Sequence, residues 1–170
     1  MQPNEVFSAG NNPLIDMKTL LIGKTGVGKT TLIQRLKGED LSHRKTQTIE
    51  YHMNFIDTPG EYLEHREFYR ALIVTAVDAD FIGFMQGCGD EDVWLPPAFA
   101  MTFARPVFGI VSKSDLARND EDIRIADEVL RCAGAQRTFV VSAAKNTGID
   151  ELREYLGGET VERRPIKCRD

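Results

Sequence analysis

The feature that most constrains this chain is a glycine-rich segment that lies between two apolar runs near the N-terminus. Residues 23–30 read GKTGVGKT and fit G-x-x-x-x-G-K-[ST], the pattern of a phosphate-binding P-loop. The apolar residues 19–22 before it predict a buried strand, and Leu32, Ile33 and Leu36 after it predict a helix. Because a P-loop joins a strand to a helix, this context favours a phosphate site over a chance glycine turn.

Each part of this loop has an expected contact with phosphate. Glycines let the turn wind tightly, so that backbone N–H groups and the positive end of the helix dipole point at one oxyanion. We expect Lys29 to neutralise β- and γ-phosphate oxygens and the Thr30 hydroxyl to bind Mg²⁺. The loop residues expected to contact the nucleotide are Gly23, Lys24, Thr25, Gly26, Val27, Gly28, Lys29, Thr30 and Thr31.

A second motif, DTPG, follows a short apolar strand and begins at Asp57. An acid at the end of a buried strand that faces a P-loop is the second anchor of Mg²⁺ in P-loop nucleotidases. We therefore expect Asp57 to anchor the ion and the Gly60 N–H to meet the γ-phosphate. In the polar loop before the motif, Thr46 is the candidate for a switch contact to Mg²⁺, with Thr48 as the alternative.

The length of 170 residues indicates one domain. Residues 1–16 hold Pro and Gly without any period and predict a flexible N-terminal extension, and the charged residues 158–170 predict a flexible C-terminal tail. Residues 17–157 form the expected P-loop domain. Its expected strands are 18–22, 49–51, 54–56, 80–85, 106–111 and 138–141, and its expected helices are 29–37, 67–76, 98–104, 119–133 and 149–156.

This alternation of strands and helices predicts a three-layer α/β fold with a mostly parallel sheet and helices on both faces. In such a fold the ligand lies at the carboxyl ends of the strands. Each motif described here directly follows an expected strand, so the motifs and the architecture agree.

Composition narrows the class of partner. The net charge of −5 argues against a general nucleic-acid surface and against binding to anionic membranes. The cysteines, at 88, 132 and 168, are odd in number and lack the spacing of a zinc site, which favours a reduced, cytoplasmic compartment. The histidines, at 43, 52 and 65, also lack metal-ligand spacing and are expected at the surface. No apolar run is long enough to span a bilayer.

Two further motifs, SKSD at 112–115 and SAA at 142–144, complete an order that resembles the Ras-like, translation-factor class of small GTPases. Residues 45–84 make the resemblance more specific. They read KTQTIEYHMNFIDTPGEYLEHREFYRALIVTAVDADFIGF. This text resembles the family of ethanolamine-utilisation protein P and propanediol-utilisation protein V, and the resemblance covers residues 17–156. It implies a GTPase-like fold and a link to bacterial microcompartments that break down ethanolamine or 1,2-propanediol. An acetate-kinase-type activity is also associated with this family.

The resemblance also implies how the base is read. Asp115 matches the aspartate that accepts guanine's N1–H and 2-amino protons, and Lys113 would lay its methylenes along the base. Ser142 and Ala143 match the loop whose backbone N–H contacts the base oxygen. Ser112 stands where the usual residue is Asn, which is expected to weaken guanine selectivity. GTP and GDP are the expected ligands, and ATP is the alternative.

The candidate catalytic residues are Lys29 and Glu61. Glu61 replaces the Gln that orients the attacking water in Ras-type enzymes, and an ionised Glu is repelled by a γ-phosphate. We therefore expect slow intrinsic hydrolysis. The side chain of Thr25 would also crowd the space around the γ-phosphate. Arg44 as an internal arginine finger is an alternative, but a solvated loop cation is favoured.

Three functions compete at this point. The first is a GTP-binding switch with weak hydrolysis. The second is an ATP-dependent phosphotransferase acting on a small carboxylate such as acetate; no arginine pair is clearly placed for it, although Arg44, Arg66 and Arg70 are near in sequence. The third is an adaptor that docks to a microcompartment shell or core enzyme through residues 94–103. The favoured interpretation of this segment is an ordinary core helix.

Overall fold

The computed structural model describes residues 17–42, 45–52 and 54–157. Their sheet has six strands in the order β2-β3-β1-β4-β5-β6, and only the β2–β3 pair is antiparallel. The strands are β1 (Thr19–Gly23), β2 (Glu50–His52), β3 (Phe55–Asp57), β4 (Phe81–Gly87), β5 (Val107–Ser112) and β6 (Thr138–Val140). The predictions made for the two terminal segments and for Arg44, His43 and Cys168 fall outside the described residues.

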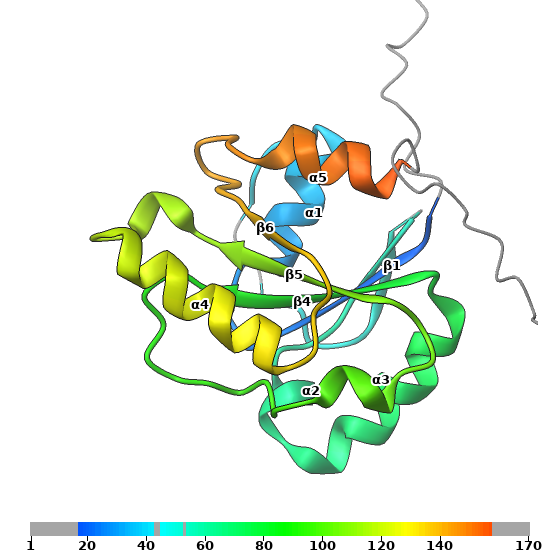
Figure 1. The fold of residues 1–170 in the computed structure, drawn as a ribbon. Helices are drawn as coiled ribbons and strands as arrows, with labels where there is room; N and C mark the ends of the chain where they lie inside the picture. The colour runs from blue at the N-terminus through cyan, green and yellow to red at the C-terminus, as the bar shows by residue number, and fades with distance from the viewer. Residues whose placement is uncertain (1–16, 43–44, 53, 158–170) are drawn as a thin grey trace, which may run out of the picture.

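Helices cover both faces of this sheet, as Figure 1 shows: α1 and α5 lie on one face, and α2, α3 and α4 lie on the other. The α/β, three-layer P-loop fold expected from the sequence is confirmed. The α-helices are α1 (Lys29–Lys37), α2 (Glu61–Glu64), α3 (Tyr69–Thr75), α4 (Asp120–Cys132) and α5 (Ile149–Leu156). The 3-10 helices are η1 (Arg66–Phe68), η2 (Ala76–Asp78), η3 (Phe99–Thr102) and η4 (Ser114–Leu116). None of the helices in these ranges is both long enough and apolar enough to cross a bilayer.

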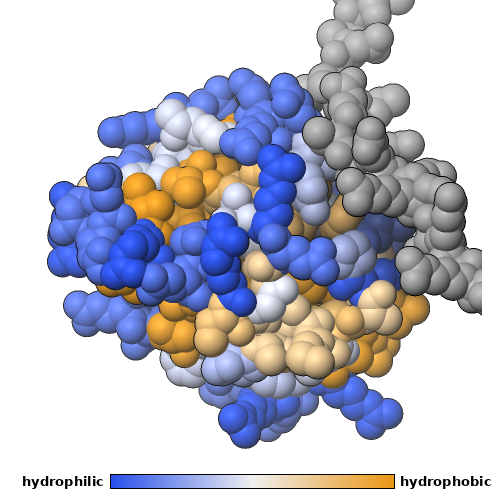
Figure 2. Space-filling view, viewed as in Figure 1, coloured by the Kyte–Doolittle hydropathy of each residue, from blue (hydrophilic) through white to orange (hydrophobic). Residues whose placement is uncertain are grey.

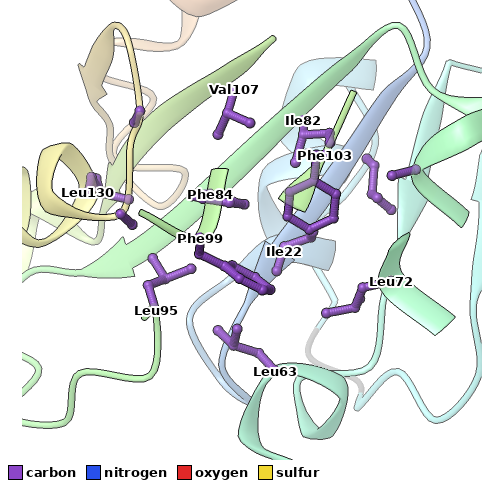
Figure 3. Close-up of a cluster of buried hydrophobic side chains, with 14 of the residues drawn as sticks. Ile22, Leu63, Leu72, Ile82, Phe84, Leu95, Phe99, Phe103, Val107 and Leu130 are labelled. Carbon is purple, nitrogen blue, oxygen red and sulfur yellow. The ribbon is translucent and has the colours of Figure 1, made fainter. Parts of the chain in front are cut away.

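Two apolar clusters fill the space between the layers, because successive side chains of a strand point to opposite faces. In β1, Leu20 and Ile22 join one cluster and Leu21 joins the other. Figure 3 shows the first cluster, where Phe84 of β4 stacks on Phe99 with ring centroids 5.5 Å apart. All five residues of β1 are buried, so the strand that carries the P-loop is held on both faces.

Three expected elements differ from the structure. The helix expected at 67–76 is broken into η1, α3 and η2, and the helix expected at 98–104 shortens to η3. The reason at η3 is that Phe99 and Phe103 both point into the core, with ring centroids 5.1 Å apart, and a short turn suffices to place them. His52 was expected to lie outside the strand at 49–51 but pairs with Phe55 in the antiparallel ladder, so β2 extends to His52.

The sequence analysis also missed α2, which begins directly after the DTPG motif. Its four residues are too few to show a helical period, so no pattern could predict it. His65 ends it in an extended conformation, at φ −124° and ψ 117°. The chain therefore turns between α2 and η1, which seats Leu63 in the core while Glu64 of α2 faces the P-loop.

Gly148 and Gly38 allow a matched test of how the loop after β6 is packed. Both have left-handed backbones, with φ +70° and +72°. A Cβ on Gly148 would lie 2.1 Å from the carbonyl oxygen of Val140, whereas no described atom lies within 4 Å of a Cβ on Gly38. We expect Gly38→Ala to cost about 1 kcal/mol of unfolding free energy and Gly148→Ala about 3 kcal/mol, because a steric clash is added to the same backbone strain. Urea unfolding measures both, and equal losses would contradict the packing described.

Candidate functional site

A cavity of about 560 Å³ opens at the carboxyl ends of the parallel strands. This is the edge at which the four sequence motifs were expected to meet. Of the residues predicted to contact a nucleotide or metal, the cavity is lined by Thr25, Gly26, Val27, Gly28, Lys29, Thr30, Thr31, Thr46, Gly60, Lys113, Asp115 and Ala143. The other predicted residues do not line the cavity. They are Gly23, Lys24, Asp57, Glu61 and Ser142.

The P-loop wraps one end of the cavity, and its glycines are required there for different reasons. Gly28 precedes α1 with φ +103°, in the left-handed region that other residues rarely adopt. Gly23 is needed for space instead, because a Cβ there would lie 2.8 Å from Val27 Cγ1 and 2.9 Å from the Met85 carbonyl oxygen. The turn thus packs against β4 and leads straight into the N-terminus of α1, where an anion is favoured.

Lys29 is nearly enclosed by this loop, with 6% of its surface exposed. Its Nζ donates to the carbonyl oxygens of Gly23, at 2.7 Å, and Lys24, at 3.0 Å. Burial lowers the pKa of Lys29 to about 8, although Asp57, Glu64 and Glu61 act in the opposite direction. A desolvated ammonium of this kind gains strongly from an incoming phosphate oxygen.

The three predicted metal residues converge on one point beside the P-loop. Thr30 Oγ1 donates to Asp57 Oδ2 at 2.5 Å, and Thr46 Oγ1 donates to the same oxygen at 3.0 Å. The two hydroxyl oxygens lie 2.8 Å apart. Thr48, the alternative to Thr46, is exposed and takes no part in this cluster. The structure therefore separates two threonines that the sequence left as alternatives.

This cluster fits Mg²⁺ by its chemistry. All its atoms are hydroxyl or carboxylate oxygens, the ligands that Mg²⁺ prefers. Asp57 Oδ1 is buried and has no hydrogen-bond partner among the described residues, so it can bind a water of the ion's shell. In the described ranges no group of three or more His, Cys, Asp or Glu side chains could hold a metal ion alone. An ion here would take its remaining ligands from water and phosphate.

Thr58 has a supporting role that the sequence analysis did not assign. Its Oγ1 donates to the carbonyl oxygen of Leu21 at 2.8 Å, which ties the end of β3 to the strand that carries the P-loop. The hydroxyl is buried, so this hydrogen bond is shielded from water. It fixes the position of Asp57, its neighbour in the chain, relative to Thr30.

Glu61, a candidate catalytic residue from the sequence, does not line the cavity. It pairs with the exposed Lys45, and this hydrogen-bonded ion pair lowers the pKa of the Glu61 carboxyl and raises the pKa of Lys45. Glu64, one helical turn further on, turns inward instead, and its Oε1 accepts a hydrogen bond from the Thr25 N–H at 2.8 Å. The sequence carried no signal for this second contact.

At the other end of the cavity, a buried serine holds the predicted base-reading carboxylate. Ser142 Oγ donates to Asp115 Oδ1 at 2.5 Å and accepts from the Lys145 N–H at 3.0 Å. The Asp115 side chain is thereby oriented before any ligand arrives. Ser142 thus acts through its side chain on Asp115, in addition to the backbone role that the resemblance implies.

Ser112 connects the two ends of the cavity. Its hydroxyl donates to the carbonyl oxygen of Val27 at 2.8 Å, which joins the end of β5 to the P-loop. Arg35 of α1 makes a comparable link to the loop at 142–144, because its Nε donates to the Ala143 carbonyl oxygen at 2.6 Å. The sequence analysis missed Arg35, since the two residues are 108 positions apart and belong to different motifs.

A second, more open hollow of about 480 Å³ lies beside residues 45–48, the candidate switch segment. Its lining consists of Lys45, Gln47, Pro59, Glu61, Tyr62, His65, Glu67 and Phe68. Lys45 lines both this hollow and the main cavity. Arg66 and Arg70, considered from the sequence for a carboxylate, are exposed and do not line it. The hollow therefore offers one lysine and one histidine to an anion.

Similarity to known proteins extends over most of the chain. The profile of the PduV-EutP family, described as "Ethanolamine utilisation - propanediol utilisation", matches residues 16–158. The propanediol utilization protein PduV of Citrobacter freundii is 42% identical over 144 residues, which cover 84% of this chain and 94% of that protein. A probable acetate kinase, EutP of Escherichia coli K12, is 32% identical over 142 residues, covering 82% of this chain and 88% of that one.

The fold is also similar to a solved structure of the GTPase Era from Aquifex aeolicus, bound to GDP.AlF4-. The TM-score is 0.58 at 20% sequence identity, with 83% of this chain covered. The chain spans about half of the Era chain, 56% of its length. This likeness shows a shared P-loop fold and nothing more specific.

Thr46 and Thr48 allow a direct test of the metal cluster. We expect Thr46→Val to weaken Mg²⁺-dependent binding of a nucleoside triphosphate by about tenfold or more, because the hydroxyl beside Asp57 is lost. Thr48→Val, which makes the same change at an exposed position of the same segment, should leave affinity within about twofold. Calorimetric titration with and without Mg²⁺ measures this, and a larger effect at Thr48 would contradict the assignment.

Proposed function

This chain belongs to the PduV-EutP family of ethanolamine and propanediol utilisation proteins, and we propose that it binds guanine nucleotides with Mg²⁺ and hydrolyses GTP slowly. One observation carries the proposal. A single cavity has the P-loop lysine and the Thr30–Thr46–Asp57 cluster at one end and the oriented Asp115 carboxylate at the other. Those are the groups that a guanine nucleotide and its metal ion would require.

At the phosphate end, the proposed chemistry is an in-line attack of water on the terminal phosphoryl group. The protein's contribution is to position the phosphate and stabilise its charge. The Lys29 ammonium would leave the Gly23 and Lys24 carbonyls and bind β- and γ-phosphate oxygens. Thr30, Thr46 and Asp57 would hold Mg²⁺, which when bound neutralises part of the phosphate charge.

Slow hydrolysis is expected because the residue at the water-orienting position is unsuited to that task. Glu61 is ionised, paired with Lys45 and absent from the lining of the cavity. An anion there also repels the γ-phosphate, so positioning by Lys29, backbone N–H groups and the metal would supply most of the rate. The proposal is therefore a nucleotide-binding switch with weak turnover.

Guanine is favoured over adenine because Asp115 presents a carboxylate, which only accepts hydrogen bonds. Guanine's N1–H and 2-amino group both donate, whereas adenine has no such pair on that edge. The Ser112 hydroxyl is engaged with the Val27 carbonyl, so it offers the base less than an amide would. Selectivity therefore rests on Asp115 and on the loop at Ser142 and Ala143.

The second candidate is an ATP-dependent, acetate-kinase-type phosphotransfer. Two observations favour it: the similar EutP protein is described as a probable acetate kinase, and the open hollow beside the switch shares Lys45 with the main cavity. A small carboxylate in that hollow would face Lys45 and His65. The paired Glu61 opposes it, because it already neutralises Lys45 and would repel a carboxylate.

We also propose that the protein acts together with a bacterial microcompartment, through its shell or a core enzyme. The family's description, in terms of ethanolamine and propanediol utilisation, supports this. Figure 2 shows apolar side chains gathered in the lower right part of the visible face, in the region where α3 lies in Figure 1. Val74 and Val77 are 62% and 67% exposed, and Trp94 is 40% exposed, whereas Phe99 and Phe103 are buried. An adaptor surface would use such exposed residues rather than the whole 94–103 segment.

Nucleotide affinity is the first test of the proposed function. We expect GDP and GTP to bind about tenfold or more tightly than ADP and ATP in the presence of Mg²⁺, a difference of roughly 1.4 kcal/mol. Asp115→Ala should remove this preference, and Lys29→Ala should remove binding of all four nucleotides. Calorimetric titration measures each affinity. Equal or tighter adenine binding would favour the phosphotransferase, and an absence of binding would favour a scaffold that does not use nucleotide.

The identity of residue 61 gives a test of turnover. We expect Glu61→Gln to raise the rate of GTP hydrolysis roughly tenfold, because an amide can orient water without repelling the γ-phosphate. Phosphate release under single-turnover conditions measures the rate, with Glu67→Gln as a matched control on the exposed side of the same segment. A rate that depends on added acetate, in the unchanged protein with ATP, would instead support the phosphotransferase.

A further inference from the structure

The segment that follows the DTPG motif is closed over the P-loop. Glu64 of α2 accepts a hydrogen bond from the Thr25 N–H, with 2.8 Å between Oε1 and nitrogen. Gly60 lies against the same peptide, because a Cβ built on it would be 2.0 Å from the Thr25 nitrogen and 2.3 Å from Thr25 Cα. The backbone of Gly60 and the carboxylate of Glu64 thus converge on one residue of the loop.

The Thr25 N–H belongs to the set of P-loop groups suited to an oxyanion. Thr25 lines the main cavity together with Gly26 and Val27. Here, however, the oxyanion bound to the Thr25 N–H comes from the protein itself. The Glu64 carboxylate also acts on the buried Lys29 ammonium, as do Asp57 and Glu61. Glu64 thus presents to this part of the site the same charge and the same acceptor chemistry as a phosphate oxygen.

The position of this contact points to the terminal phosphate. The N-terminus of α1 and the Thr30–Asp57 cluster lie on the side where a diphosphate and its metal would bind. Thr25 lies on the side of Gly60, whose N–H is the expected partner of the γ-phosphate. A nucleoside diphosphate therefore leaves the Glu64 contact intact. A triphosphate brings an anion to a place already taken by a carboxylate.

We propose that Glu64 sets the preference of this site for nucleoside diphosphate over triphosphate, by occupying the Thr25 N–H as a substitute for the terminal phosphate. The inference rests on the proposed nucleotide binding and adds to it a residue that determines specificity. A triphosphate binds only when Glu64 leaves, which moves α2 away from the P-loop. Because Tyr62 of α2 stacks on Phe68 of η1, with ring centroids 4.9 Å apart, the movement would extend beyond Glu64 itself.

The test compares the affinities of GDP and of the non-hydrolysable analogue GDPNP, by calorimetry with saturating Mg²⁺. Glu64→Ala should raise the ratio of GDPNP affinity to GDP affinity about tenfold or more, almost entirely through tighter GDPNP binding. Glu64→Gln keeps an acceptor for the Thr25 N–H but removes the charge, so it should raise the ratio by less. Glu154→Gln, which removes a charge from an exposed position of α5, should leave the ratio unchanged.

The outcomes separate this inference from the proposed function. An unchanged ratio in both Glu64 variants, in a protein that binds both nucleotides, would overturn the role of Glu64 alone. An equal loss of affinity for both nucleotides would also overturn it, and would show that Glu64 only supports the P-loop. If the unchanged protein binds neither nucleotide, both proposals fail. Thermal melting of the near-isosteric Glu64→Gln variant, matched to the unchanged protein, ensures that the comparison is made between folded proteins.

Discussion

The buried charge of Lys29 is the constraint on which the arrangement of the site depends. An ammonium removed from water is costly unless hydrogen bonds and opposite charges surround it. Two P-loop carbonyls supply the hydrogen bonds, and the opposing charges come from Asp57, Glu61 and Glu64. Asp57 ends β3, and Glu61 and Glu64 follow it in α2. The end of β3 and α2 thus supply the carboxylates that favour the charged form of Lys29.

The parallel sheet brings these groups to one edge of the fold. Since β1, β3, β4, β5 and β6 run in the same direction, the loops that follow them emerge at one edge. Buried hydroxyls then connect neighbouring segments: Thr58 bonds to Leu21 within β1, and Ser112 bonds to the P-loop from the end of β5. Each such bond joins two segments of the site through a backbone carbonyl. The site is therefore a set of loops fixed to one another as well as to their strands.

The two ends of the cavity differ in how ready they are for a ligand. At the base end, Ser142 already orients Asp115, and Arg35 holds the Ala143 carbonyl. At the phosphate end, the protein groups form hydrogen bonds with one another. Lys29 binds loop carbonyls, the threonine hydroxyls bind Asp57, and Glu64 binds the Thr25 N–H. Ligand binding would exchange these contacts for phosphate and metal contacts. Under the proposed function, the groups that would read the base are already in place, whereas phosphate binding would require rearrangement.

The sequence by itself determined the P-loop, the order of the motifs, the family and the α/β fold, because these depend on local spacing and on the periods of strands and helices. It favoured Thr46 over Thr48 without any geometry to support the choice, and it did not show that Glu61 turns outward to Lys45 while Glu64 turns inward to Thr25. Those outcomes were decided by the tertiary structure. The contacts join segments far apart in the chain, and their geometry depends on how a four-residue helix packs, which no sequence period encodes.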